Sequence, residues 1–276
     1  MASERRAETA LRRLSWAAAL SLALPATAAS AAPVVQRFAQ AEVDWTAGEL
    51  VASGSAEANP DLEDVAARRI DSEKRALIAA RARARAAIER LRVTASETGR
   101  ARMARPEVEA RVMGVVERAC APRDTRYYAD GGVEVVIACP LAGGLALALA
   151  PIGPKTRTPT GGSGPSALII DASGVPATPT LIPTLSGGAE TPFVAPELVR
   201  SEALRRAGGV VYVSSLTAAR AHPRAGESPV VVDVTRIDRG GAWRVTSADG
   251  ERLGDLDLGC VADNRVVVVV APERDG

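Results

Sequence analysis

The chain has 276 residues, enough for one large or two ordinary domains, and its 34 basic and 33 acidic residues give a formal charge of +1. This balance offers no electrostatic argument for a nucleic acid or an acidic membrane as partner. Aromatic residues make up 3% of the chain and His222 is its one histidine, which argues against base-stacking platforms, histidine metal sites and a Ser/His/Asp triad.

Residues 1–31 predict a secretory signal peptide. Arginines at its start precede a short apolar segment from Trp16 to Leu24, and Ala26-Thr27-Ala28 or Ala29-Ser30-Ala31 offers a cleavage site. The apolar segment is too short to remain as a membrane anchor, and no cysteine lies near the cleavage sites for acylation. We therefore expect a soluble exported protein, located in the periplasm or associated with the outer membrane through partners.

A long helix is predicted from Asn59 to Arg92, after a strand at Val43–Gly54. Asn59 is a good N-cap, and Pro60 suits the first helical position. Arginines crowd the second half of the helix, where they form either an anionic-surface or nucleic-acid patch or, as we favour, a solvated face. One apolar stripe follows helical spacing; its members are Leu62, Ala66, Ile70, Leu77, Ala84, Ile88 and Leu91.

The next segments predict a helix, or a helix running into a strand, at Glu107–Cys120, and a strand at Val133–Ile137 after a turn. Residues Val135 to Ile152 carry no charge, which touches the lower limit for a transmembrane helix. Pro140 and two glycines interrupt this run, so a strand, a turn and a small apolar segment are the favoured interpretation, and no transmembrane helix is predicted in the mature chain.

Residues 151–166 are rich in proline, glycine, serine and threonine and predict a linker between domains at 32–150 and 167–276. Strands are expected at 167–172, 210–213, 230–234, 243–245 and 265–270, with helices at 196–207 and, as a turn or short helix, at 248–256. The last strand would promote aggregation on a sheet edge. The predicted fold class is α/β (α+β): a long helix on a small, mainly antiparallel sheet, then a second small α/β domain.

Three cysteines remain in the mature chain. Cys120 and Cys139 would lie near each other across an antiparallel pair, and export makes a disulfide between them reasonable, but the strand register needed to test its geometry cannot be read from sequence. Cys260 is then left over, and such cysteines are more often buried and inert than reactive. No Cys-x-x-Cys spacing points to zinc or redox chemistry, and we predict no cofactor or metal site.

Several stretches together resemble a family of exported bacterial envelope proteins that groups the LPP-type surface lipoproteins with the flagellar assembly protein FlgT. The stretches are VDWTAGELVASGS (43–55), AARARARAAIERLRV (79–93), RYYADGGVEVVIACPLAGG (126–144), SALIIDASGVPATPTLIPTL (166–185), GAWRVTSADGERL (241–253) and NRVVVVV (264–270). The chain departs from the lipoproteins in lacking the acylated cysteine, and it has Ser173 where the family turn has arginine. Asp130, Gly131 and Asp171 match the family pattern, and we interpret them as turn-forming residues.

The resemblance implies a protein that acts by association with other envelope proteins, or with itself, and without catalysis. A structural or assembly factor is therefore the first hypothesis, and flagellar assembly is one setting for it. A periplasmic binding module for a small ligand or peptidoglycan is the alternative, and it would need a pocket with converging polar groups. An enzyme is a third reading, with Asp171, Asp233 and Asp255 or Asp257 as carboxylates, but isolated acids at strand ends are usually solvated or turn-forming.

Overall fold

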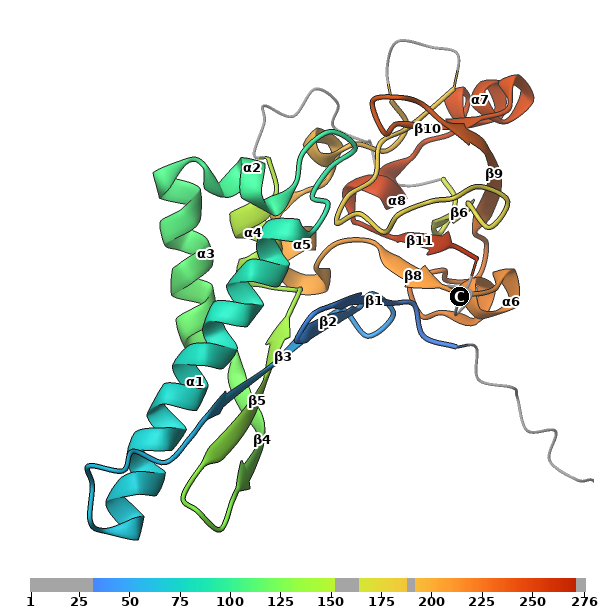
Figure 1. The fold of residues 1–276 in the computed structure, drawn as a ribbon. Coiled ribbons are helices and arrows are strands. Elements are labelled where there is room, and N and C mark those ends of the chain that lie inside the picture. Colours follow the sequence, from blue (N-terminus) through green and yellow to red (C-terminus); the bar gives the residue numbers. More distant parts are fainter. Residues whose placement is uncertain (1–31, 152–163, 188–191, 272–276) are drawn as a thin grey trace, which may run out of the picture. The chain divides into compact units, whose positions relative to one another are not determined.

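The computed structural model describes residues 32–151, 164–187 and 192–271 (Figure 1). The predicted signal peptide, and residues 152–163 of the predicted linker, lie outside the described residues. The described strands form a five-stranded sheet in the order β1-β2-β3-β5-β4 and a six-stranded sheet in the order β7-β10-β9-β6-β11-β8. The mixed α/β fold, with its long helix packed on an antiparallel sheet, is confirmed.

The first sheet is antiparallel throughout. The prediction of one strand over Val43–Gly54 was wrong, because the chain reverses within that range. The Asp44 carboxylate accepts the N–H groups of Thr46 and Ala47, both at 2.8 Å, and Gly48 takes a φ of +70°, which favours glycine. The strands are β1 (Val35–Phe38), β2 (Ala41–Asp44), β3 (Glu49–Ala56), β4 (Ala121–Tyr127) and β5 (Val133–Pro140).

Helix α1 (Val65–Arg90) begins later than the sequence predicts. Its N-cap is Asp64, whose carboxylate accepts the N–H groups of Ala66 and Ala67, whereas Asn59 accepts the N–H of Asp61 in the preceding loop. Asn and Asp are about equally good N-caps, so the sequence alone could not choose between them.

The apolar stripe of α1 was predicted correctly only from Leu77 onward: Leu77 is partly buried against the core, and Ala84, Ile88 and the C-cap Leu91 are buried. In the first half Ile70 is 57% exposed. The helix meets the sheet only from Ser72 onward, where the serine hydroxyl donates to the carbonyl of Glu57, just past the end of β3. From there the buried residues of the helix are mostly small, which lets β3 and β5 approach closely; they are Ser72, Ala76, Ala80, Ala84, Ala87 and Ile88.

The arginines of α1 do not form a purely solvated face. Arg81 donates to the carbonyl of Glu117 at 3.0 Å, and Arg83 donates to that of Ser53 at 2.7 Å. Arg85 pairs with Glu89 and Glu109, and Arg90 lies over the ring of Phe38 at 5.3 Å. Most of these guanidinium groups therefore tie α1 to its neighbours, α3 and the first sheet.

Three shorter helices complete the first half: α2 (Gly99–Met103), α3 (Pro106–Ala119) and α4 (Gly144–Leu149). The uncharged run from Val135 splits into β5, a turn and α4, and none of the helices in the described ranges has the length and apolar character needed to cross a membrane. Arg102 is buried and donates to the carbonyls of Leu149 at 2.8 Å and Ala150 at 3.0 Å. Its guanidinium therefore provides hydrogen bonds for carbonyl groups at the end of α4 that have no partner within the helix.

The second sheet has a parallel centre, in which β9, β6, β11 and β8 run alongside one another. The valine-rich β11 lies between β6 and β8, so it is not the edge strand that would promote aggregation. The strands are β6 (Leu168–Asp171), β7 (Leu185–Ser186), β8 (Val211–Val213), β9 (Val230–Ile237), β10 (Trp243–Val245) and β11 (Val266–Val269). The helices are the 3-10 turn η1 (Pro196–Leu198), α5 (Ser201–Ala207), α6 (Leu216–Ala221), α7 (Ser247–Gly254) and α8 (Gly259–Ala262).

The two sheets share one hydrophobic core, in which Tyr212 of β8 has a central place. Its ring packs edge-on against Trp45, with 5.5 Å between the ring centroids. Its hydroxyl donates to the carbonyl of Thr180 and accepts the N–H of the same residue, both at 2.8 Å. The Tyr212 hydroxyl therefore replaces a strand partner for this buried backbone segment.

We expect Tyr212→Phe to lower the free energy of unfolding by about 2 kcal/mol, because it leaves the buried N–H and C=O of Thr180 without a partner while it keeps the ring. Urea denaturation of both proteins measures the change. Tyr128→Phe is the matched control, since its hydroxyl bonds only the exposed carboxylate of Glu134. Equal stability of the two variants would contradict the expectation.

Candidate functional site

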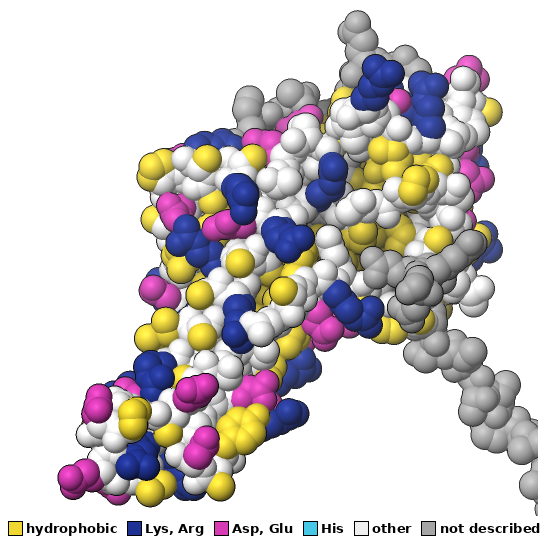
Figure 2. Space-filling view, viewed as in Figure 1, with side chains coloured by type: hydrophobic (Ala, Val, Ile, Leu, Met, Phe, Trp, Pro, Cys, Tyr) yellow, Lys and Arg dark blue, Asp and Glu magenta, His cyan; other side chains and the backbone are white. Residues whose placement is uncertain are grey.

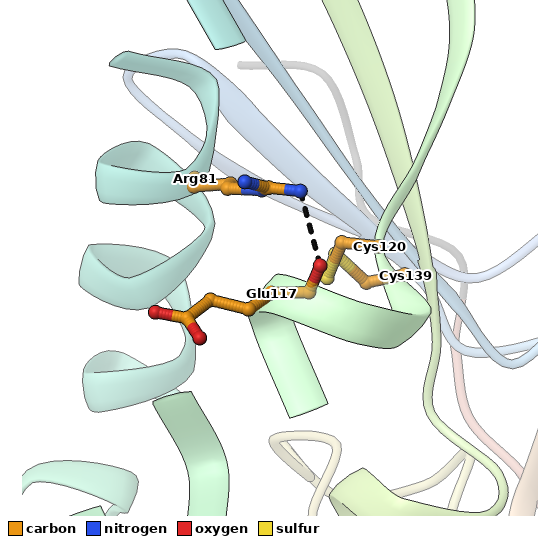
Figure 3. The surroundings of a disulfide bond; sticks show 4 residues. All are labelled: Arg81, Glu117, Cys120 and Cys139. Atoms are coloured by element: carbon orange, nitrogen blue, oxygen red, sulfur yellow. Dashed lines mark hydrogen bonds between the residues drawn. A yellow bond between two sulfur atoms is a disulfide. The ribbon is translucent and has the colours of Figure 1, made fainter. Parts of the chain in front are cut away.

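Cys120 and Cys139 are joined by a disulfide in the structure, with their Cα atoms 4.2 Å apart. Both residues are buried, and the bond connects the start of β4 to β5 beside the cross-strand pair of Ala121 and Ala138. Figure 3 shows Arg81 of α1 directed at the carbonyl of Glu117, near this disulfide. The disulfide and the arginine together secure the end of α3 and the start of the β4–β5 hairpin.

The turn residues that match the family pattern make backbone contacts. The Asp130 carboxylate accepts the N–H of Gly132 at 2.9 Å, and Gly131 has a φ of +91°. The Asp171 carboxylate, at the end of β6, accepts the N–H and the hydroxyl of Ser173 at 2.9 and 2.6 Å. These are the contacts by which aspartate and glycine stabilise tight turns.

The four candidate carboxylates do not form one cluster. Asp171 and Asp233 lie side by side on β6 and β9, whereas Asp255 caps the end of α7 and Asp257 accepts the N–H of Gly259. Among the described residues no group of three or more His, Cys, Asp or Glu side chains is placed to hold a metal ion. Burial raises the pKa of the free thiol of Cys260 to about 11, so this cysteine is protonated at neutral pH.

His222 contributes to a turn after α6. Its Nδ1 accepts the backbone N–H of Arg224 at 3.1 Å. Burial, and then the nearby charge of Arg224, lower the pKa of His222 below its usual 6.5. The neutral ring is thus the form that the folded protein uses, because an imidazolium nitrogen cannot accept this hydrogen bond.

We expect protonation of His222 to lower the free energy of unfolding as the pH falls below neutral. Because its pKa is lower in the folded than in the unfolded chain, its contribution is fully present above pH 6.5 and is lost as the pH falls through the folded value. His222→Asn retains an acceptor for the N–H of Arg224 without titrating, so its thermal midpoint should fall less than that of the natural chain between pH 7 and pH 5. Parallel losses in the two proteins would contradict this expectation.

A pocket of 310 Å³ lies where the loop after α1, the β6–β7 loop and the β9–β10 turn meet. Arg92 follows α1, and its guanidinium donates to the carbonyl of Ala95 at 3.0 Å. Arg239 lies on the β9–β10 turn beside Asp238. The remaining lining residues that bear on its chemistry are Thr178, Thr180 and Trp243.

No pattern in the sequence predicts this pocket. In the sequence Arg92 is one of the arginines that crowd the end of the long helix, and the residues between β9 and β10 match no functional motif. The one local signal is the Asp-Arg-Gly-Gly sequence at 238–241, which predicts a turn but not what the turn faces.

Exposed hydrophobic side chains define a second region, which we call the α1–β4 surface: Ile70, Ile78 and Tyr127. Ile70 and Ile78 are eight residues apart on α1, which places them toward one side of the helix, and Ile78 is 66% exposed. The hydroxyl of Tyr127 donates to Glu73, which lies one turn from Ile70, so the tyrosine extends this surface onto β4. In Figure 2 hydrophobic side chains stand among charged ones where the free ends of α1 and the β4–β5 hairpin lie in Figure 1.

Comparison with known proteins yields a family match. A family model described as "Treponema pallidum Tp0624, second domain" matches residues 167–272. No curated protein matches the chain. The resemblance to the LPP-type and FlgT family stays a prediction. The matched segment contains the six-stranded sheet and begins where the sequence predicts its second domain, so it is consistent with a second domain at this place.

Proposed function

We propose that this protein is a non-catalytic, exported component of the cell envelope that acts as a structural or assembly factor in the periplasm or at the outer membrane. The α1–β4 surface carries the proposal. The exposed large hydrophobic side chains in the described part of the chain all lie on α1 or at the β4–β5 turn: Val65, Ile70, Ile78, Tyr127 and Tyr128. Their concentration on one part of the fold is typical of a protein contact surface.

Two further observations support the proposal. The Cys120–Cys139 disulfide suits an oxidising compartment, as an exported protein would meet. The candidate carboxylates are spread over three places in the fold, and Asp171 and Asp257 are engaged by nearby backbone N–H groups. The partner we propose for the α1–β4 surface is another envelope protein with an apolar contact surface of its own.

Photo-crosslinking in the native host tests this function. A benzoylphenylalanine at Ile78 should form an adduct with a protein that fractionates with the outer membrane or with an envelope assembly. The same residue at Glu251, an exposed position on α7, is the matched control and should form none. An Ile78 adduct with a second copy of the chain would show self-association in place of another partner. Equal labelling from both positions, or none from Ile78, would overturn the proposal.

The second candidate function is a periplasmic binding module for a small ligand or peptidoglycan. One observation favours it, namely the 310 Å³ pocket, whose lining includes arginine, aspartate and threonine residues. Pockets formed where separate parts of a fold meet are frequent ligand sites.

A further inference from the structure

The 310 Å³ pocket lined by Arg92 and Arg239 is held together by backbone contacts of Ala95. The carbonyl of Ala95 holds the guanidinium of Arg92 at 3.0 Å. The same carbonyl lies against Gly241, where an added Cβ would be 2.2 Å away, so the β9–β10 turn packs directly on the loop after α1. One residue therefore positions both the first arginine and the turn that carries the second.

The charge of this pocket is positive. Asp238 also lines it, but its carboxylate is already paired with Arg244 at 2.6 Å and with Arg236 at 3.4 Å. Within the described ranges neither Arg92 nor Arg239 forms an ion pair. A guanidinium has five N–H donors. The Arg92 guanidinium donates one hydrogen bond to the carbonyl of Ala95, so its other donors remain for a ligand.

The other walls add apolar contact and hydroxyl groups. Trp243 is buried and contributes to the lining, while Thr178 and Thr180 stand on the β6–β7 loop. The hydroxyl of Thr180 donates to the carbonyl of Thr178 at 3.1 Å, which fixes the orientation of that side chain in the wall. A volume of 310 Å³ lies at the small end of the range for ligand pockets, so the pocket suits a small molecule.

We propose that this pocket binds a small organic oxyanion, a carboxylate or a phosphate, through Arg92 and Arg239, with its apolar part toward Trp243. Arginine is suited to either group because its planar fork matches two oxygen atoms at once. The site is separate from the α1–β4 surface, so the proposal stands or falls independently of the association proposed above.

Nuclear magnetic resonance titration of the ¹⁵N-labelled protein tests the proposal, with sodium phosphate and sodium succinate as probes. The indole N–H signal of Trp243, assigned through Trp243→Phe, should shift and saturate, while that of Trp45 stays in place. Sodium chloride at the same ionic strength should not shift it. A response to phosphate alone identifies a phosphate ligand, a response to succinate alone identifies a carboxylate, and a response to both supports the oxyanion site in general.

Arg92→Gln and Arg239→Gln should each weaken binding by about tenfold, because each removes a charged hydrogen-bonding group. Arg206→Gln, which changes an exposed arginine on α5, is the matched control and should leave the affinity unchanged. Arg239→Lys keeps the positive charge but loses the planar guanidinium that can bond two oxygen atoms at once, so it should weaken binding less than Arg239→Gln. The proposal is overturned if chloride reproduces the shift, if neither probe shifts the Trp243 signal, or if Arg206→Gln weakens binding as much as the pocket variants.

Discussion

Replacing Gly54 with alanine should lower the free energy of unfolding by about 3 kcal/mol, although it adds a single methyl group. Gly54 lies on β3 where α1 crosses the sheet. An added Cβ would stand 2.2 Å from the carbonyl oxygen of Ala76 and 2.2 Å from the backbone nitrogen of Ala80. Both atoms belong to the backbone of α1, so no side-chain rotation can relieve the overlap, and helix and sheet must move apart. Urea denaturation measures the change.

Gly240→Ala is the control for this effect. Gly240 has no heavy atom within 4 Å of its added Cβ, and it lies on the β9–β10 turn far from α1 in the sequence. Its substitution should change stability by less than about 0.5 kcal/mol, as surface changes usually do. If Gly54→Ala is tolerated as well as Gly240→Ala, the close packing of α1 on β3 is wrong.

Removal of the Cys120–Cys139 disulfide should also cost about 3 kcal/mol. The two cysteines are 19 residues apart, and cross-linking a loop of this length restricts the unfolded chain by about that amount. The variant with both cysteines changed to alanine should therefore unfold at lower urea concentration than the natural chain. The bond also holds the start of β4 against β5.

A reducing agent provides the matched comparison. Dithiothreitol should destabilise the natural chain to about the level of the double alanine variant and should leave that variant unchanged. Cys260→Ala should keep the full sensitivity to reductant, because Cys260 is a free thiol. A natural chain that resists unfolding equally with and without reductant would show that the disulfide does not contribute.

Local patterns in the sequence were enough for most elements of the second sheet. Strands such as β6 and β11 are short runs of β-branched and aliphatic residues. The helix predicted at 196–207 ends at Ala207 as expected, but it is divided into the 3-10 turn η1 and helix α5, which begins at Ser201. The first half was harder. Alanines on every side of α1 weaken its hydrophobic periodicity, so the sequence could not show that Ser72 and Ala76, rather than Ile70, face the sheet. The Gly48 turn likewise divides a segment that has the composition of one strand.

The candidate sites illustrate the same limit more strongly. Arg92 and Arg239 are 147 residues apart in the chain, and Ile70 and Tyr127 are 57 apart, so no motif links either pair. Each pair is created by packing: the β9–β10 turn against Ala95, and the β4–β5 hairpin against Glu73.

By itself the sequence determined the α/β class, the long helix and most of the strands, because these follow from composition, spacing and turn residues within a few neighbouring positions. Only the tertiary structure decided which face of α1 is buried, that β11 is an inner strand, that the helix arginines bond to neighbouring elements, and that Arg92 and Arg239 line the same pocket. These features depend on contacts between distant segments. Their geometry is set by how closely backbones approach, which a linear pattern of residue types does not record.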